Sequence, residues 1–181
     1  MKYFLLQLEK RNNTFPEITT KSQTINPKLV CKEKFHQIPD TTMLYVKSEK
    51  NIVFPEILME PVFLVSETFM RVMSFYDKGI LYKRIGLFDN KTEKSVGYYL
   101  PLLDEKDDCL APESIFDKTG QILIRPVLNE KAVRKSAIFK IGGVTKIHVV
   151  VRLDFIESIL RRSMAGIQLK ELEVKMNGDQ S

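Results

Sequence analysis

The same pattern of apolar and polar positions occurs in two stretches of the chain, residues 63–82 and residues 149–169. Each stretch begins with an apolar run typical of a buried strand, continues through a polar break into an amphipathic helix, and ends with a glycine and a second strand. The aligned pairs are Val65 with Val151, Phe69 with Phe155, Met73 with Ile159 and, after one inserted residue, Gly79 with Gly166. We therefore expect two strand–helix–strand segments. An internal duplication would explain them, and so would the chance recurrence of a common pattern.

Residues at the ends of the two expected helices indicate where each helix begins and stops. Ser66 is expected to cap the first helix, because its hydroxyl can accept a hydrogen bond from a free N–H group of the first turn. Asp154 is expected to cap the second helix in the same way. Gly79 and Gly166 follow the helices, at positions where a positive φ angle often ends a helix. The two aligned phenylalanines are expected in the core.

The rest of the chain favours strands. The expected features are a strand over residues 1–8, mostly loop over residues 9–40, a hairpin over residues 81–103 with a polar tip, a short helix from Asn129 to Arg134, and a hairpin over residues 137–151 that turns at Gly142-Gly143. Tyr82 is expected to contact Tyr98 or Tyr99 across the first hairpin. Pro101 indicates that the second strand of that hairpin either is an edge strand or ends there, because proline lacks a backbone N–H.

These elements predict an α+β fold of mostly antiparallel sheet with two main helices and, on one interpretation, a duplicated strand–helix–strand unit. We expect a strand- and loop-rich N-terminal lobe over residues 1–55, an α+β domain over residues 56–176, and a frayed tail over residues 177–181. A chain of 181 residues with 44% hydrophobic and 28% charged residues is long and apolar enough for a real core.

Composition also narrows the cellular setting. No apolar run approaches the roughly 20 residues that cross a bilayer, and the N-terminal apolar stretch lacks the length and cleavage site of a signal peptide. Cys31 and Cys109 are too few and too far apart for a disulfide framework or a metal site, so free thiols in a reducing compartment are expected. We expect a cytoplasmic protein without a membrane contact and without a cofactor.

Charge is unevenly distributed along a chain whose formal net charge is +5. Acidic residues outnumber basic residues only in residues 51–110, and they are densest at Asp104, Glu105, Asp107 and Asp108. This acidic loop lacks the ligand spacing and the glycine of a calcium loop, so a solvated turn is the first interpretation. A docking surface for a basic protein partner is the functional alternative, because complementary charge accelerates association without fixed geometry.

Candidate catalytic residues lack the neighbours that chemistry requires. His36 lies in an expected loop, and His148 lies in an expected strand, where a structural hydrogen bond is the simpler role. Neither cysteine has a base nearby in sequence. Ser66 lacks the flanking glycines of a nucleophile elbow, so helix capping is favoured. The residues therefore predict no catalytic site.

The order of short motifs resembles a known bacterial family. Val65-Ser66-Glu67 enters the first helix, Asp108-Cys109-Leu110 follows the hairpin with Ser114 shortly after, and Ile138-Phe139-Lys140-Ile141 precedes the second copy, which ends in Ala165-Gly166-Ile167-Gln168-Leu169. Over roughly residues 60–174 this order is similar to that of the immunity-protein-eleven family. At the second strand-to-helix junction the chain has Val151-Arg152-Leu153-Asp154, where Val-Ser-Glu would match the family more closely.

The resemblance implies a function without catalysis. Members of that family are polymorphic-toxin immunity proteins, which would bind and neutralise a cognate toxin, and the resemblance transfers no toxin-binding residues to this chain. We therefore expect a protein-binding module with a cognate protein toxin as partner. Two other classes stay open: a basic protein associated with nucleic acid, which a pI near 9.1 permits, and an uncharacterised enzyme.

Overall fold

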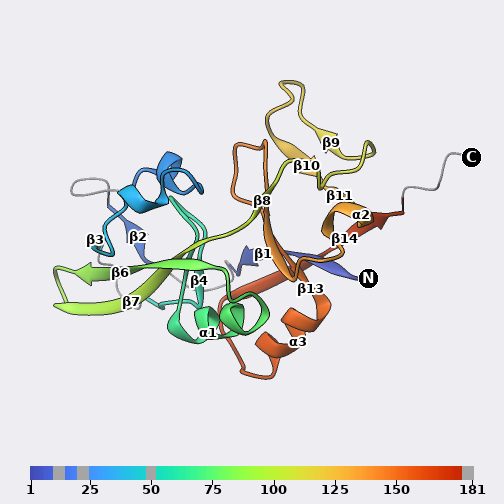
Figure 1. Ribbon diagram of the computed structural model, residues 1–181. Helices are drawn as coiled ribbons and strands as arrows, with labels where there is room; N and C mark the ends of the chain where they lie inside the picture. Colours follow the sequence, from blue (N-terminus) through green and yellow to red (C-terminus); the bar gives the residue numbers. More distant parts are fainter. Residues whose placement is uncertain (10–14, 20–24, 48–51, 177–181) are drawn as a thin grey trace, which may run out of the picture. The chain divides into compact units, whose positions relative to one another are not determined.

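The fold is described from a computed structural model, which describes residues 1–9, 15–19, 25–47 and 52–176 (Figure 1). These residues divide into two compact units. Unit 1 contains residues 1–7, 103–163 and 168–181, and unit 2 contains residues 8–102 and 164–167. The expected boundary near residue 55 lies inside unit 2, and the expected tail over residues 177–181 lies outside the described residues. The two units, rather than the expected lobe and domain, are the organisation of the described chain.

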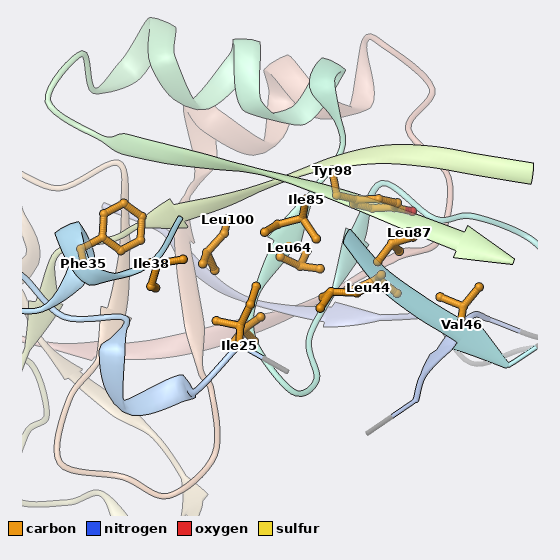
Figure 2. Packing of buried hydrophobic residues seen from close by; sticks show 12 residues of the cluster. Ile25, Phe35, Ile38, Leu44, Val46, Leu64, Ile85, Leu87, Tyr98 and Leu100 are labelled. Carbon is orange, nitrogen blue, oxygen red and sulfur yellow. The ribbon is translucent and has the colours of Figure 1, made fainter. Parts of the chain in front are cut away.

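Unit 2 is built on a six-stranded sheet of order β2-β3-β6-β7-β5-β4. Its elements are β2 (Glu17–Ile18), the 3-10 turns η1 (Pro27–Leu29) and η2 (Phe35–Gln37), β3 (Thr41–Lys47), β4 (Ile57–Leu58), β5 (Leu64–Val65), α1 (Glu67–Tyr76), β6 (Leu81–Asp89) and β7 (Lys94–Leu102). β3 runs parallel to β6, and the other neighbouring strands are antiparallel. Residues of alternate positions on β3, β6 and β7 fill the core, as Leu44, Ile85 and Leu100 illustrate (Figure 2).

Unit 1 contains a second six-stranded sheet, of order β11-β14-β1-β13-β12-β8, and a separate two-stranded sheet of β9 and β10. Its elements are β1 (Tyr3–Leu8), β8 (Glu105–Lys106), β9 (Ile115–Phe116), β10 (Leu123–Arg125), β11 (Val127–Asn129), α2 (Glu130–Val133), β12 (Ile138–Ile141), β13 (Val149–Arg152), α3 (Leu153–Leu160) and β14 (Ile167–Lys175). The valines of β13 are fully buried, which confirms the interpretation of that run as a strand covered on both faces.

The two units share one strand order. In unit 2 the strands follow β4-β5-β7-β6-β3, and in unit 1 they follow β12-β13-β1-β14-β11. A helix connects β5 to β6 in one unit and β13 to β14 in the other, and the strand pair at the end of each series is parallel. The expected strand–helix–strand segments are therefore present in both units. The central strand differs in origin, because β7 directly follows β6, whereas β1 comes from the N-terminal end of the chain.

A buried tyrosine hydrogen bond within unit 2 has a counterpart at the matching place within unit 1. The buried Tyr98 hydroxyl on β7 donates to the Pro55 carbonyl oxygen at 2.6 Å, and the buried Tyr3 hydroxyl on β1 donates to the Val133 carbonyl oxygen at 2.7 Å. Each acceptor lies just before the hairpin that contains the strand preceding the helix. The next residues in the two strands, Tyr99 and Phe4, pair with the aligned valines of β5 and β13. Internal duplication accounts for this agreement in strand order, register and hydrogen bonding better than chance recurrence does.

The helix ends confirm some expectations and correct others. The Ser66 hydroxyl accepts a hydrogen bond from the Phe69 amide at 3.1 Å and caps α1 as expected. Asp154 does not cap α3: the cap residue is Arg152, and Asp154 lies in the first turn. The reason is that the Asp154 carboxylate accepts two hydrogen bonds from the Arg152 guanidinium, each 2.7 Å long. Gly166 has the expected positive φ of 77°.

Gly79 departs from its expected conformation. Its φ is not positive, because α1 already ends at Asp77, which is extended with a φ of −144°. The Asp77 carboxylate then accepts the Gly79 amide at 2.8 Å. The turn after α1 is therefore stabilised by the Asp77 side chain and not by a positive φ at Gly79.

The hairpin at residues 137–151 is present, but its expected tight turn is wrong. β12 and β13 pair antiparallel with Lys140 opposite Val149, so residues 142–148 form the connection. The Gly142 amide donates to the Lys106 carbonyl at 2.9 Å, because β8 lies along the free edge of β12. A Cβ atom at Gly142 would collide with Asp107 Oδ1, so a larger residue there would displace the Asp107 side chain.

The other hairpin agrees with its pattern. β6 and β7 pair along their full length, and the Tyr82 and Tyr99 rings meet edge to face at 6.4 Å between centroids. β7 is a central strand of the sheet, which corrects the edge alternative for Pro101. Pro101 is tolerated because β5 pairs with β7 only at Tyr99, so the side of β7 that faces β5 has no strand partner at Pro101. No helix in the described residues is long and apolar enough to cross a membrane.

Candidate binding surface

The four acidic residues singled out by sequence divide into two pairs. Asp104 lies 3.2 Å from the Lys106 ammonium, and Glu105 lies 2.8 Å from the Lys140 ammonium. The Glu105–Lys140 ion pair and the Asp104 carbonyl, which accepts the Lys140 amide at 2.9 Å, help to hold β8 beside β12, whereas the Asp104–Lys106 pair lies within the β8 segment. Asp107 and Asp108 are exposed and have no ion-pair partner among the described residues. Only the second pair therefore presents uncompensated negative charge.

The segment 142–148 connects this acidic pair to the two-stranded sheet. At one end Gly142 packs directly against the Asp107 carboxylate. Near its middle the Thr145 hydroxyl donates to the Gln121 carbonyl at 3.2 Å, and the Thr145 amide donates to the same oxygen at 3.4 Å. Gln121 immediately precedes the apolar residues of β10. The acidic pair and the β9–β10 hairpin thus lie at either side of one short segment within unit 1.

The β9–β10 hairpin exposes three isoleucines. Ile115 is 46% exposed, Ile122 43% and Ile124 58%. Leu123 is buried in the core of unit 1 and Phe116 packs against it, whereas the three isoleucines are exposed to solvent. Exposed apolar side chains that gather on one element can mark sites where proteins bind one another. We call Ile115, Ile122, Ile124, Asp107 and Asp108 together the hairpin surface.

The turn of the hairpin is held rigidly. The Asp117 carboxylate accepts the Ile122 amide at 2.9 Å and the Gln121 amide at 3.1 Å, and the Thr119 hydroxyl donates to it at 2.7 Å. The backbone hydrogen bond from Ile122, followed by the Thr119 hydroxyl, lowers the pKa of Asp117. Gly120 supplies the positive φ of 73° that the turn needs. A rigid turn lowers the entropy lost when the hairpin binds a partner.

The base of the hairpin is attached to the large sheet of unit 1. The Ser114 hydroxyl accepts the Val127 amide at 3.0 Å and contacts the Val127 carbonyl at the same distance. The Arg125 guanidinium lies 2.6 Å from the Glu173 carboxylate on β14. These contacts fix the hairpin to β11 and β14, so its outer face is presented by a supported element rather than by a free loop.

The two candidate histidines belong to different units of the described chain. His148 precedes β13, and its Nδ1 lies 2.9 Å from the Lys146 carbonyl, so the expected structural hydrogen bond is present. His36 is an exposed residue of η2 in the other unit. Cys109 is fully buried, its thiol donates to the Lys106 carbonyl at 3.1 Å, and burial raises its pKa to about 11. A thiol with such a pKa is protonated at neutral pH and is a poor nucleophile.

A cavity in unit 2 was not anticipated by sequence. Its volume is about 230 Å³, and it lies where η1, the end of η2 and the start of β3 meet. Its walls are Ile25, Asn26, Leu29, Gln37, Ile38, Pro39, Thr41 and Thr42. No sequence motif marks these residues, because they belong to the stretch interpreted as mostly loop.

Comparison with known proteins adds no relative: no family model matches the chain, and no curated protein sequence matches it. Within the described residues, no group of three or more histidine, cysteine, aspartate or glutamate side chains has an arrangement that could hold a metal ion. The hairpin surface and the cavity are therefore interpreted from their own geometry.

Proposed function

We propose that the protein is a non-catalytic protein-binding module, an immunity protein that acts in the cytoplasm by binding and neutralising a cognate bacterial toxin. The observation that carries the proposal is the hairpin surface, where a hairpin with three exposed isoleucines is linked through the segment 142–148 to Asp107 and Asp108. The resemblance of residues 60–174 to immunity proteins supplies the kind of partner.

The isoleucines supply the affinity in this proposal. Complete burial of an isoleucine side chain contributes about 1.5–3 kcal/mol, and each of the three is about half exposed. Covering them would therefore contribute roughly 3 kcal/mol in total, which is a substantial part of a complex that buries about 800 Å² per partner. Such apolar anchors at the centre of an interface dominate its binding energy.

The two carboxylates increase the rate of association in this proposal. Asp107 and Asp108 attract a basic partner over about 10 Å at 0.1 M salt, and this attraction weakens as salt increases. Asp104 and Glu105 contribute less, because Lys106 and Lys140 already neutralise them. The binding site of the partner is thus expected to combine an apolar patch with lysine or arginine side chains.

Co-expression with the toxin encoded by the neighbouring gene tests the proposal. The Ile122→Asp/Ile124→Asp variant should lose protection while its far-UV circular dichroism stays unchanged. The matched control is Leu160→Asp on α3, where an equally apolar and 64% exposed side chain lies outside the hairpin surface. Protection should be retained by that control and by the His36→Gln/His148→Gln variant.

Four outcomes would contradict the proposal. A gene neighbourhood without a toxin gene would remove the partner. Full protection by the isoleucine variant would exclude the hairpin surface. Loss of protection by the folded histidine variant would indicate catalysis, and a salt-dependent shift of DNA or RNA by the purified protein would favour nucleic-acid binding.

A further inference from the structure

The buried hydroxyl of Thr42 is the starting point, because Thr42 forms part of the cavity wall in unit 2. Thr42 lies at the start of β3 on the face that also carries Leu44 and Val46, and only 9% of its surface is exposed. Among the described residues its Oγ1 is the buried side-chain oxygen without a hydrogen-bond partner. A buried hydroxyl without a partner destabilises a folded protein. Thr42 therefore needs an explanation other than stability.

The fold itself does not require a hydroxyl at this position. The register of β3 on β6 and of β11 on β14 makes Met43 correspond to Val127. Thr42 then corresponds to Pro126, which is buried and has no hydroxyl. The same strand start thus forms in unit 1 with an apolar side chain, so the strand does not require a hydroxyl at this position.

The walls of the cavity define the chemistry of an occupant. Its apolar contacts come from Ile25, Leu29, Ile38 and Pro39, and Figure 2 shows Ile38 and Val46 at opposite ends of the adjoining core cluster. Among the residues that the structure describes, the polar lining residues are asparagine, glutamine and threonine, none of which is ionisable. A charged occupant would lose its hydration without gaining a counter-charge. An uncharged occupant with an apolar body fits these walls.

The volume limits the size of the occupant. The space of about 230 Å³ is comparable with apolar cavities of roughly 150 Å³ that bind a molecule of the size of benzene. A rotation of about 120° around χ1 moves the hydroxyl of a threonine to the position of its methyl and the methyl to the position of the Cβ hydrogen, and by this rotation Thr42 can turn Oγ1 toward an occupant that offers a hydrogen bond. We propose that this cavity binds a small uncharged molecule with an apolar ring or branched body and one hydroxyl or amide group, which pairs with Thr42.

Phenol and fluorobenzene provide a matched pair of probes, because they share a ring and differ in the hydroxyl group. Titration of the full chain, followed by amide ¹H–¹⁵N correlation spectra, should show phenol shifting amides of residues 25–29 and 37–42. Phenol should bind about tenfold more tightly than fluorobenzene, the effect of one hydrogen bond to an otherwise unpaired buried group. Thr42→Val should abolish this preference, and Thr42→Ser should keep it.

Stability gives an independent readout that a general surface effect would not produce. Thr42→Val should raise the denaturation midpoint, because it replaces an unpaired hydroxyl by a methyl group of similar shape. Thr92→Val is the matched control and should lower it, because the Thr92 hydroxyl donates to Asp89 at 2.7 Å. Equal affinity of the wild type for both probes, phenol shifts confined to other residues, or an unchanged phenol preference in Thr42→Val would overturn the proposal.

This inference is separate from the proposed immunity function. The cavity belongs to unit 2 and the hairpin surface to unit 1. Phenol binding at Thr42 with full loss of toxin protection in the isoleucine variant would support both. If phenol does not bind at Thr42, the co-expression assay still decides the immunity function, and if the co-expression assay fails, the phenol titration still decides the cavity.

Discussion

Removing the hydroxyl of Tyr98 should destabilise unit 2 more than removing the hydroxyl of Tyr3 destabilises unit 1. The two tyrosines occupy matching positions on β7 and β1, and both hydroxyls are buried donors to backbone carbonyls. Tyr98→Phe and Tyr3→Phe therefore delete the same group from the same place in each unit. The ring packing is retained in both variants, so the difference isolates the hydrogen bond.

The expected magnitudes follow from what remains at each acceptor. In the described residues the Tyr98 hydroxyl is the donor to Pro55 O, so Tyr98→Phe leaves a buried carbonyl unpaired and should cost about 1–3 kcal/mol. Val133 O also accepts the Ser136 amide at 2.9 Å. Tyr3→Phe therefore leaves one hydrogen bond in place and should cost about 0.5–1.5 kcal/mol.

Urea denaturation followed by circular dichroism measures the two changes in unfolding free energy. Amide hydrogen exchange then assigns each loss to its own unit, because two compact units need not unfold together. Changes below about 0.3 kcal/mol in both variants would show that these hydroxyls do not stabilise the fold. A larger loss in Tyr3→Phe than in Tyr98→Phe would refute the argument from the second donor.

Three further changes test the rest of the fold. Phe69→Ala and Phe155→Ala should each cost about 3–5 kcal/mol in denaturant melts, since both rings are fully buried at matching positions; a loss below about 1 kcal/mol would contradict their place in the core. Burial raises the pKa of the Cys109 thiol from 9.0 to about 11. The contribution of this buried neutral thiol to the free energy of unfolding is therefore fully present below pH 9, and the free energy of unfolding should fall by roughly 2–3 kcal/mol as pH rises to 11. Cys109→Ala should flatten that part of the pH profile, and an unchanged profile would show that other groups cause it. A circular permutant that joins Lys175 to Tyr3 through a short glycine–serine linker should fold with a melting temperature close to that of the wild type, because β1 would then follow β14 as β7 follows β6; an unfolded permutant would contradict that equivalence.

The sequence predicted the helices well because their signals are local. The spacing of apolar residues identified α1 and α3, and the capping hydroxyl of Ser66 marked where α1 begins. The deviations were also local in origin. Asp154 failed as a cap because Arg152, two residues earlier, binds its carboxylate, and an ion pair of that kind is not visible in an apolar pattern.

Strand partners were harder to predict because they depend on contacts between distant residues. Residues 1–8 were correctly interpreted as a strand, yet nothing in their pattern indicates that β1 lies between β13 and β14. The same limit applies to the acidic loop. Its four carboxylates look equivalent in sequence, and the parallel pairing of β8 with β12 brings Lys140 to Glu105 and leaves Asp107 and Asp108 unpaired.

Both candidate binding sites lie in the segments where the two units differ. The cavity belongs to residues 25–42, which precede and begin β3, and the hairpin surface belongs mainly to residues 107–124, which precede β11. β3 and β11 are themselves equivalent strands, each parallel to the strand that follows its helix. The shared strands are constrained by their common packing, whereas the segments before β3 and β11 can change without altering that order. With this shared scaffold, one unit can carry a cavity and the other an exposed hairpin. The sequence patterns that identify the shared strands and helices predict neither the cavity nor the exposed hairpin.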